Sequence, residues 1–318
     1  APAPAASRMA AVFRLSLGIG DIDSYAMLFY GHYPRYCERA ATASLPAQSG
    51  AFFQLTSADL IKYSKSVGWN DVVDIRSTAV PPTKDASSDE RAFLHEWICE
   101  GKTVHTCLAT YRLVTAEPPT HDAPPTIAPA AAAPAAASSQ EGSEVAAPEG
   151  QAERMLQRRV VALRRESSSL FEPPLASYRS QCFEVYADML DAAGGLGLPT
   201  VLDYMERQRT EMIGGQAELE RLQAEGVMIV VYAVHQLRLS HAAVRPRQTI
   251  EVSSGVEVQN EMFYCVHQRI RLRDGGPISE AHLKLVFVKD GAIGKAPAAV
   301  LRHIAEGGTL GTAASPTS

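Results

Sequence analysis

The fold is decided by the stretch GIGDIDSYAMLFYGHYPRYCERAATASL, residues 18–45. An alternating strand pattern, AVFRLSLGI, comes directly before it, and its second part has the apolar spacing of a helix over about residues 29–42. Asp21 and Asp23 stand in the turn between these two elements. A related stretch, ADMLDAAGGLGLPTVLDYMERQRTEMIGG, occurs at residues 187–215. A strand, an acidic turn and a helix therefore occur twice, which indicates an internal duplication.

The spacing of landmark residues supports this duplication. In each copy a tyrosine follows the turn aspartate after thirteen positions and begins a Tyr-x-Glu-Arg motif. The two pairs are Asp23 with Tyr36, and Asp191 with Tyr204. Further along, residues 63–77 align without a gap with residues 240–254. Two landmarks in the same order at matching spacing make coincidence a poor explanation.

Strand patterns follow the helix in both copies. Residues 71–79, 91–101 and 102–115 alternate and are rich in β-branched and aromatic side chains, whereas residues 43–70 are interpreted as a linking segment. In the second copy, residues 228–291 contain four such strand patterns. One helix followed by several long strands predicts an α+β fold in which an antiparallel sheet wraps around a central buried helix. Two such units in tandem are expected to pair within the chain.

Composition places the domain boundaries. Residues 117–150 contain seven prolines, many alanines and no aromatic residue, so they cannot bury enough apolar area to fold and are expected to form a linker. The predicted organisation is a first domain at 10–116, this linker, a helical lead-in at 151–174, a second domain at 175–305 and a tail at 306–318.

Charge and hydropathy exclude some classes of function. The net charge of −5 argues against a nucleic-acid binder, which usually presents a basic face. The longest apolar run, residues 227–234, is far shorter than the roughly 20 residues of a membrane-spanning helix. The five cysteines are scattered, without a CxxC motif, which favours free thiols and an intracellular location. The first residues, APAPAASRMA, fit what remains after removal of a mitochondrial or plastid transit peptide, or simply a chosen starting point.

The order of strand, Asp-x-Asp turn, aromatic segment, helix with Glu-Arg and further strands resembles the hotdog fold. It is similar in particular to the 4-hydroxybenzoyl-CoA thioesterase branch of the acyl-CoA thioesterases. The positions that match the family pattern are Asp21, Asp23, Tyr30, Tyr33, Tyr36, Glu38 and Arg39, and LRLSHAAVRPRQTIEV in the second copy resembles a family strand segment. The resemblance implies hydrolysis of an acyl-CoA or acyl-carrier-protein thioester by a double hotdog. Asp23 and Asp191 would be the catalytic carboxylates, each attacking the thioester or activating a water.

Other residues are candidates for substrate binding. Tyr30, His32 and Tyr33 follow the first acidic turn and would contact the substrate or line the core. Gly194 keeps the family glycine three residues after Asp191. Arg245 and Arg247, at a strand entry, suit the phosphates of coenzyme A. The basic run at 157–165 is either a further phosphate contact or a solvated helix face.

No zinc-ligand spacing, nucleophile elbow or phosphate-binding loop occurs, so neither a metal nor a cofactor is expected. For Asp23 the structural alternative is a helix N-cap.

A second class of function competes with the enzyme. The family glycine is Ala26 in the first copy, and GLGLPTV replaces the aromatic run in the second. Together with the long Ala/Pro linker, these departures fit a hotdog pair that has lost catalysis and serves as an accessory subunit of a large protein complex. A dehydratase or hydratase shares the fold, but the histidine and acid that such enzymes pair are not evident here.

Overall fold

The computed structural model describes residues 11–17, 27–46, 50–81, 87–115, 149–168, 173, 178–191, 194–240, 242–260 and 262–306. Four features that the sequence singled out lie outside these residues. They are the first acidic turn with Asp21 and Asp23, Ala26, the linker up to residue 148, and the tail from residue 307.

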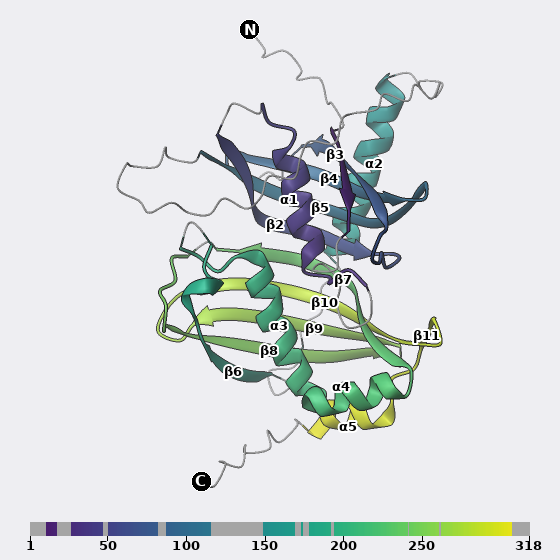
Figure 1. Cartoon of the computed structure of the whole chain (residues 1–318), viewed down its shortest axis with the longest axis vertical. Coiled ribbons are helices and arrows are strands. Elements are labelled where there is room, and N and C mark those ends of the chain that lie inside the picture. Colours follow the sequence, from purple (N-terminus) through teal and green to yellow (C-terminus); the bar gives the residue numbers. More distant parts are fainter. Residues whose placement is uncertain are drawn as a thin grey trace.

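The first half is a five-stranded antiparallel sheet that wraps around one helix (Figure 1). Its elements are β1 (Ala11–Ser16), α1 (His32–Thr42), β2 (Ala51–Tyr63), β3 (Val72–Val80), β4 (Glu90–Cys99) and β5 (Lys102–Thr115). The strands lie in the order β1-β3-β4-β5-β2. Helix α1 buries Tyr33, Tyr36, Cys37, Ala40 and Ala41, a spacing of three and four residues that places them on one face.

The second half repeats this arrangement. Its main elements are β6 (Arg179–Glu184), α3 (Leu198–Met212), β7 (Val227–Leu239), β8 (Thr249–Asn260), β9 (Phe263–Leu272) and β10 (Pro277–Lys289). The strand order β6-β8-β9-β10-β7 is the order of the first half, element for element. The second half adds a 3₁₀ turn (Ala187–Met189), α4 (Gly215–Ala224), β11 (Ala292–Gly294) and α5 (Ala298–Glu306). These additions were not expected from the sequence.

Strands β2 and β7 pair antiparallel from Ser57 opposite Arg238 to Lys62 opposite Ala233, and they join the two halves into one sheet. We call this junction the seam. The interpretation of residues 43–70 as a linking segment was therefore wrong, because β2 occupies thirteen of them. Buried and less buried residues alternate along β2, but two β-bulges, between Leu55 and Ser57 and between Ala58 and Leu60, break the pattern.

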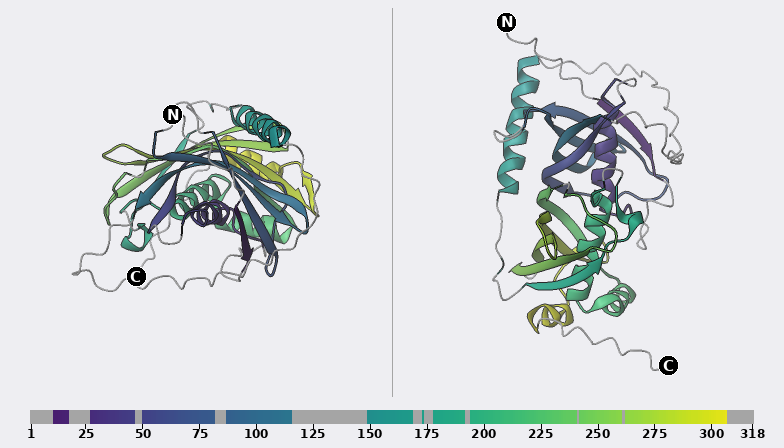
Figure 2. Two further views of the ribbon diagram at one scale, coloured as in Figure 1. Left: turned by 90° about the horizontal axis from the view of Figure 1, so that it is seen from above. Right: turned by 90° about the vertical axis from the view of Figure 1, so that its left-hand side faces the viewer.

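Helix α2 (Glu149–Ser167) lies on the outer face of the sheet, opposite α1, as Figure 2 shows. Val160 packs there in a small cluster with Leu94 and Leu108. Basic residues of the helix also contact the sheet: Arg159 pairs with Glu96 at 2.7 Å, and Arg164 with Asp59 at 3.2 Å. Two arginines of the basic run thus face the sheet and pair with its acidic residues.

Equivalent positions of the two halves carry equivalent contacts. Ser77 and His95 face each other across β3 and β4, and the Ser77 hydroxyl lies 2.8 Å from His95 Nδ1. In the second half, Gln268 Nε2 donates to the Ser254 hydroxyl at 2.7 Å across β8 and β9. The duplication thus extends to buried polar pairs in the sheet.

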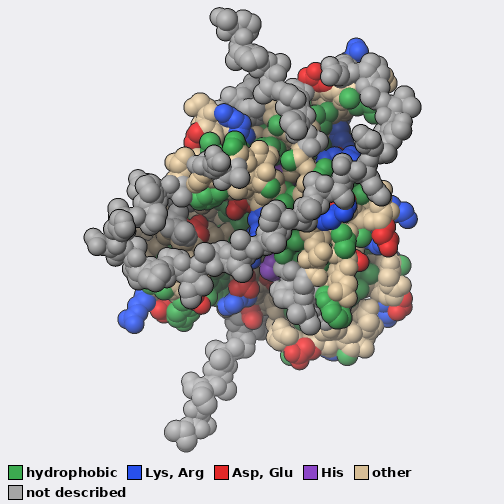
Figure 3. All heavy atoms as spheres, turned by 45° about the horizontal axis from the view of Figure 1, so that its top comes forward, with side chains coloured by type: hydrophobic (Ala, Val, Ile, Leu, Met, Phe, Trp, Pro, Cys, Tyr) green, Lys and Arg blue, Asp and Glu red, His purple; other side chains and the backbone are tan. Residues whose placement is uncertain are grey.

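On the face shown in Figure 3, acidic and basic side chains are interspersed. Within the described part of the chain, no helix is long and apolar enough to cross a membrane.

Candidate active site at the seam

Asp191 lies in a tight turn just before α3. Its Oδ1 accepts a hydrogen bond from the Gly195 backbone N–H at 2.9 Å, and its own N–H donates to the Gly195 carbonyl at 2.8 Å. Gly194 has a φ of +76°, a conformation that glycine adopts at little cost. The turn brings Asp191 beside Gly197, the residue at which α3 starts without a side-chain cap. A carboxylate is thereby held at the positive end of a helix dipole.

Glu38 of α1 is the second carboxylate of this region. Its Oε2 accepts a hydrogen bond from the Leu55 N–H at 2.9 Å. Burial raises the pKa of Glu38, the Leu55 N–H and Arg35 lower it, and the charge of Asp191 raises it again. Glu38 belongs to the first half and Asp191 to the second, so the two halves place their carboxylates within electrostatic reach of each other.

Tyr30 of the first half and Arg209 of the second half are hydrogen-bonded and connect the two halves. The Tyr30 hydroxyl donates to the Leu202 carbonyl at 3.0 Å and accepts from Arg209 Nη2 at 2.7 Å. Arg209 Nη1 donates to Gln268 Oε1 at 2.5 Å. Burial raises the pKa of Tyr30 to about 12, against the opposing effect of Arg209, so the phenol stays protonated. Arg209 is a buried cation whose hydrogen-bond acceptors here are both uncharged.

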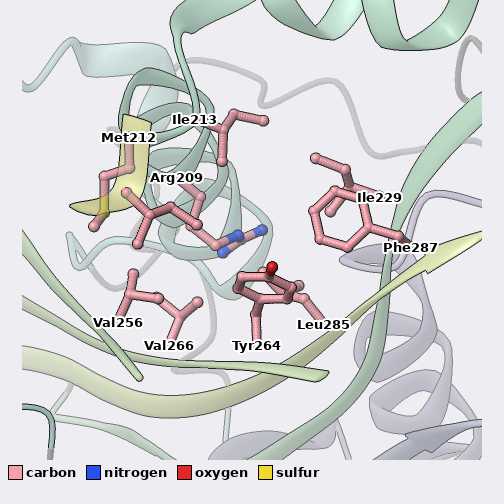
Figure 4. Close-up of a pocket in the computed structure, with 10 residues that line it drawn as sticks. Arg209, Met212, Ile213, Ile229, Val256, Tyr264, Val266, Leu285 and Phe287 are labelled. Atoms are coloured by element: carbon pink, nitrogen blue, oxygen red, sulfur yellow. The ribbon is translucent and has the colours of Figure 1, made fainter. Parts of the chain in front are cut away.

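An apolar pocket opens beside Arg209, between α3, α5 and the sheet of the second half. Figure 4 shows the guanidinium pointing in among the lining side chains, towards Tyr264. The pocket encloses about 360 Å³ between atoms, part of it open to solvent. Among the described residues that line the pocket, Arg209 alone is charged; the others are Met212, Ile213, Ile229, Val256, Tyr264, Val266, Leu285, Phe287 and Ile304. Such a lining suits a hydrocarbon chain.

The remaining predicted residues have different surroundings. His32 begins α1 half-buried, with its ring edge-on to Phe29 at 5.5 Å. Tyr33 is only 2% exposed and packs between Trp97 and His105 at centroid distances of 4.7 and 4.6 Å, so it belongs to the core.

Arg245 and Arg247 are exposed in the turn before β8, where their backbone N–H groups bond Gln248 and Val185. Their side chains therefore face solvent at the edge of the second half, where an anion could reach them.

A group of titratable residues lies on the outer face of the second half. His267 and His282 stack at 4.1 Å with an interplanar angle of 6°, and Glu280 Oε1 lies 2.7 Å from His267 Nε2. The Tyr178 hydroxyl bonds the other nitrogen of His267. A metal bonds imidazole in the plane of the ring, so two parallel stacked rings cannot share one cation without turning. This arrangement is a hydrogen-bonded stack rather than a metal site.

The fold is shared with thioesterases of known structure. An oleoyl thioesterase (putative) from Lactobacillus plantarum matches with a TM-score of 0.55 at 10% identity, over 88% of this chain and 96% of that one. The 12:0-ACP thioesterase from Umbellularia californica matches with a TM-score of 0.53 at 8% identity, over 87% and 95%. At such identities the likeness establishes the fold alone, which is the hotdog fold that the sequence predicted. No family model matches the chain, and no curated protein matches it in sequence.

Glu38, Arg209 and the pocket were not proposed as site residues from the sequence. Glu38 had served as a landmark of the repeat, together with its counterpart Glu206, and as one of the positions that match the family pattern. A glutamate occurs two residues after the tyrosine in both copies, and this recurrence is the feature of the sequence that could have indicated a functional role for Glu38. Arg209 carried no signal, because a basic residue on an amphipathic helix is usually solvated.

Proposed function

We propose that this protein hydrolyses acyl thioesters at a site built by both halves, with Asp191 and Glu38 as its carboxylates. The observations that carry the proposal are the Asp191 turn at the start of α3 and the position of Glu38 on α1, near enough for the Asp191 charge to raise the pKa of Glu38 as the smallest of the effects on it. Glu38 is half-buried and its pKa is raised, which is the environment of a carboxyl group that exchanges protons during catalysis. The thioesterase structures that share the fold support this reading.

The chemistry follows from the positions of the two acids. Asp191 attacks the thioester carbonyl, the carbon–sulfur bond breaks, and water then hydrolyses the acyl-aspartate anhydride to release the acid. In the other route Asp191 removes a proton from a water that attacks the carbonyl directly, and the carbon–sulfur bond breaks to give the acid and the thiol. Glu38, in its protonated form, donates a proton to the departing thiolate. Backbone N–H groups in the first turn of α3 face the same region and can stabilise the negative charge that develops on the carbonyl oxygen.

The repeat implies a second site. Glu206 corresponds to Glu38 and Asp23 to Asp191, and Glu206 shares α3 with Arg209 beside the apolar pocket. We propose that the acyl chain of an acyl-CoA or acyl-carrier-protein substrate enters this pocket, and that Arg245 and Arg247 bind carrier phosphates. We also propose that the chain belongs to the 4-hydroxybenzoyl-CoA thioesterase-like branch, on the motif residues quoted above.

The test is thiol release from short-, medium- and long-chain acyl-CoA and acyl-carrier-protein substrates. Asp191→Asn and Glu38→Gln should each lower the rate by at least roughly 10²-fold at this site, and Asp23→Asn with Glu206→Gln should do so at the other. Asp188→Asn is the matched control, because Asp188 is an exposed acid three residues from Asp191. Equal rates in the wild type and in all four variants would reject the enzymatic proposal.

One observation favours the accessory-subunit function instead. The Asp191 carboxylate holds its own turn through Gly195, and the pocket lies at the other end of α3. A chain that shows no turnover with any substrate and co-migrates with a large complex on native gels would have this function.

A further inference from the structure

Three potential metal ligands meet inside the first half, in a place unrelated to the seam carboxylates. They are Cys37 on α1 and His105 and Cys107 on β5. One donor atom from each lies within 4.8 Å of the other two, and all three residues are completely buried. Two donors bound to one zinc ion are separated by about 3.5–4 Å, given bonds of about 2.0–2.3 Å, so small side-chain rotations would close the site.

The bonding of these side chains points to a ligand. Neither ring nitrogen of His105 has a hydrogen-bond partner of good geometry among the described residues. Burial lowers the pKa of His105, and the Lys62 backbone, which lies near the ring, raises this pKa by less. A buried imidazole without partners costs free energy that a metal bond would recover. The Trp97 indole N–H points at Cys37 Sγ, at 3.2 Å. An N–H donor to sulfur stabilises a thiolate and orients it, as outer-shell groups do in metal sites.

Comparison of the halves shows that the fold does not require these residues. Cys37 follows Tyr36 as Met205 follows Tyr204. Cys107 pairs with His95 across the sheet as Ala281 pairs with Gln268. His105, two residues earlier on its strand, then corresponds to Ser279. The same three positions thus hold methionine, serine and alanine in the second half, which is not a ligand set.

We propose that Cys37, His105 and Cys107 bind one thiophilic closed-shell cation in the core of the first half: Cu⁺, which accepts three ligands, or Zn²⁺ with a water as its fourth ligand. Thiolate and imidazole are the donors that such cations prefer. Each thiol that binds loses its proton, so a divalent ion with two thiolates adds no net charge to the core. Because the ligands are fully buried, the cation would enter as the chain folds.

The experiment unfolds the full chain in denaturant with a reductant, without oxygen, and refolds it with no metal, with Zn²⁺ or with Cu⁺. After removal of loose metal on a desalting column, metal per chain and the melting temperature are measured. We expect about one cation per chain in the arm that supplies the preferred metal, with a melting temperature on the order of 5 °C or more above the metal-free sample. Competition between the two cations identifies which one the site prefers.

Variants locate the metal. Cys107→Ala introduces the residue that the second half has at this position, and Cys265→Ala, at another buried cysteine outside the cluster, is the matched control. With Co²⁺ as a probe, the wild type and Cys265→Ala should show a thiolate-to-cobalt absorption band that Cys107→Ala lacks. Two outcomes overturn the proposal: metal-free chains with an unchanged melting temperature in every arm, or equal metal content in Cys107→Ala and wild type. The first of these outcomes is measured on the wild type and therefore tests the proposal even if Cys107→Ala does not fold.

Discussion

Glu38, on the central helix of the first half, and Asp191, in the turn before the central helix of the second, interact electrostatically across the seam. Burial raises the pKa of Glu38, the Leu55 N–H and Arg35 oppose this rise, and the Asp191 charge adds a smaller increase. This relationship can be measured without any assumption about catalysis. If Asp191→Asn removes the charge, the pKa of Glu38 should fall in the variant, and carboxyl NMR titration would report the change. An unchanged Glu38 titration would contradict the contact on which the proposed site depends.

The Tyr30–Arg209 contact should contribute to the stability of the joined halves. Tyr30→Phe removes the hydroxyl that bonds Leu202 and Arg209, and we expect a loss of about 1 kcal/mol in the free energy of unfolding. Arg209→Met should cost about 1–3 kcal/mol, since it leaves Gln268 and Tyr30 with fewer partners. Because the two side chains bond each other, the double variant should be less destabilised than the sum of the single variants. Urea unfolding of the four proteins measures this, and strict additivity would show that the bond contributes nothing.

Packing, more than ion pairs, should hold α2 on the sheet. Val160 is 4% exposed in the cluster with Leu94 and Leu108, so Val160→Ala should cost about 1–2 kcal/mol. Val161 is 65% exposed on the same helix, and Val161→Ala should change stability by no more than about 0.5 kcal/mol. Arg159→Ala should also have a small effect, because its pair with Glu96 is partly solvated. If thermal unfolding shows that Arg159→Ala destabilises the protein more than Val160→Ala does, ion pairs and not packing hold α2 on the sheet.

The outer-face stack should make stability depend on pH. Burial, and next the neighbouring His267, lower the pKa of His282 to about 4; Glu280 opposes this shift, and His235 and Arg269 add to it. Below an unfolded-state pKa of about 6.5, the unfolded chain binds a proton that the folded chain does not, so the stability that His282 contributes is lost as pH falls from about 6.5 towards 4.

His282→Leu should remove this dependence, and leucine is the residue that the first half has in the corresponding place, Leu108. Between pH 7 and 5 the variant should lose about 1 kcal/mol less stability than the wild type, a figure reduced from the full shift because solvent screens the site. Urea unfolding at both pH values measures the difference. Equal losses in the two proteins would show that His282 titrates normally.

Much of the fold could be predicted from the sequence, because its determinants are local. The Asp191 turn, the helical spacing of α1 and α3, and the β-branched and aromatic content of β3, β4 and β5 are each set within about fifteen residues. The duplication was visible as well, since spacing survives where identity does not. Strand β2 was the exception. Two β-bulges, between Leu55 and Ser57 and between Ala58 and Leu60, shift its register, so the alternation along the strand is broken twice.

The sequence by itself determined that two similar α+β units follow each other and that an acidic turn with Asp191 precedes the central helix of the second. Only the tertiary structure decided which residues meet. Glu38 reaches Asp191, Tyr30 reaches Arg209, and Cys37 reaches Cys107 across separations of 153, 179 and 70 positions. These contacts depend on the strand register and on how the two helices lie against the sheet, and both are fixed by packing over the whole molecule. Local sequence patterns do not predict contacts over such separations. The carboxylate pair and the buried cysteine–histidine cluster were therefore found only in the folded structure.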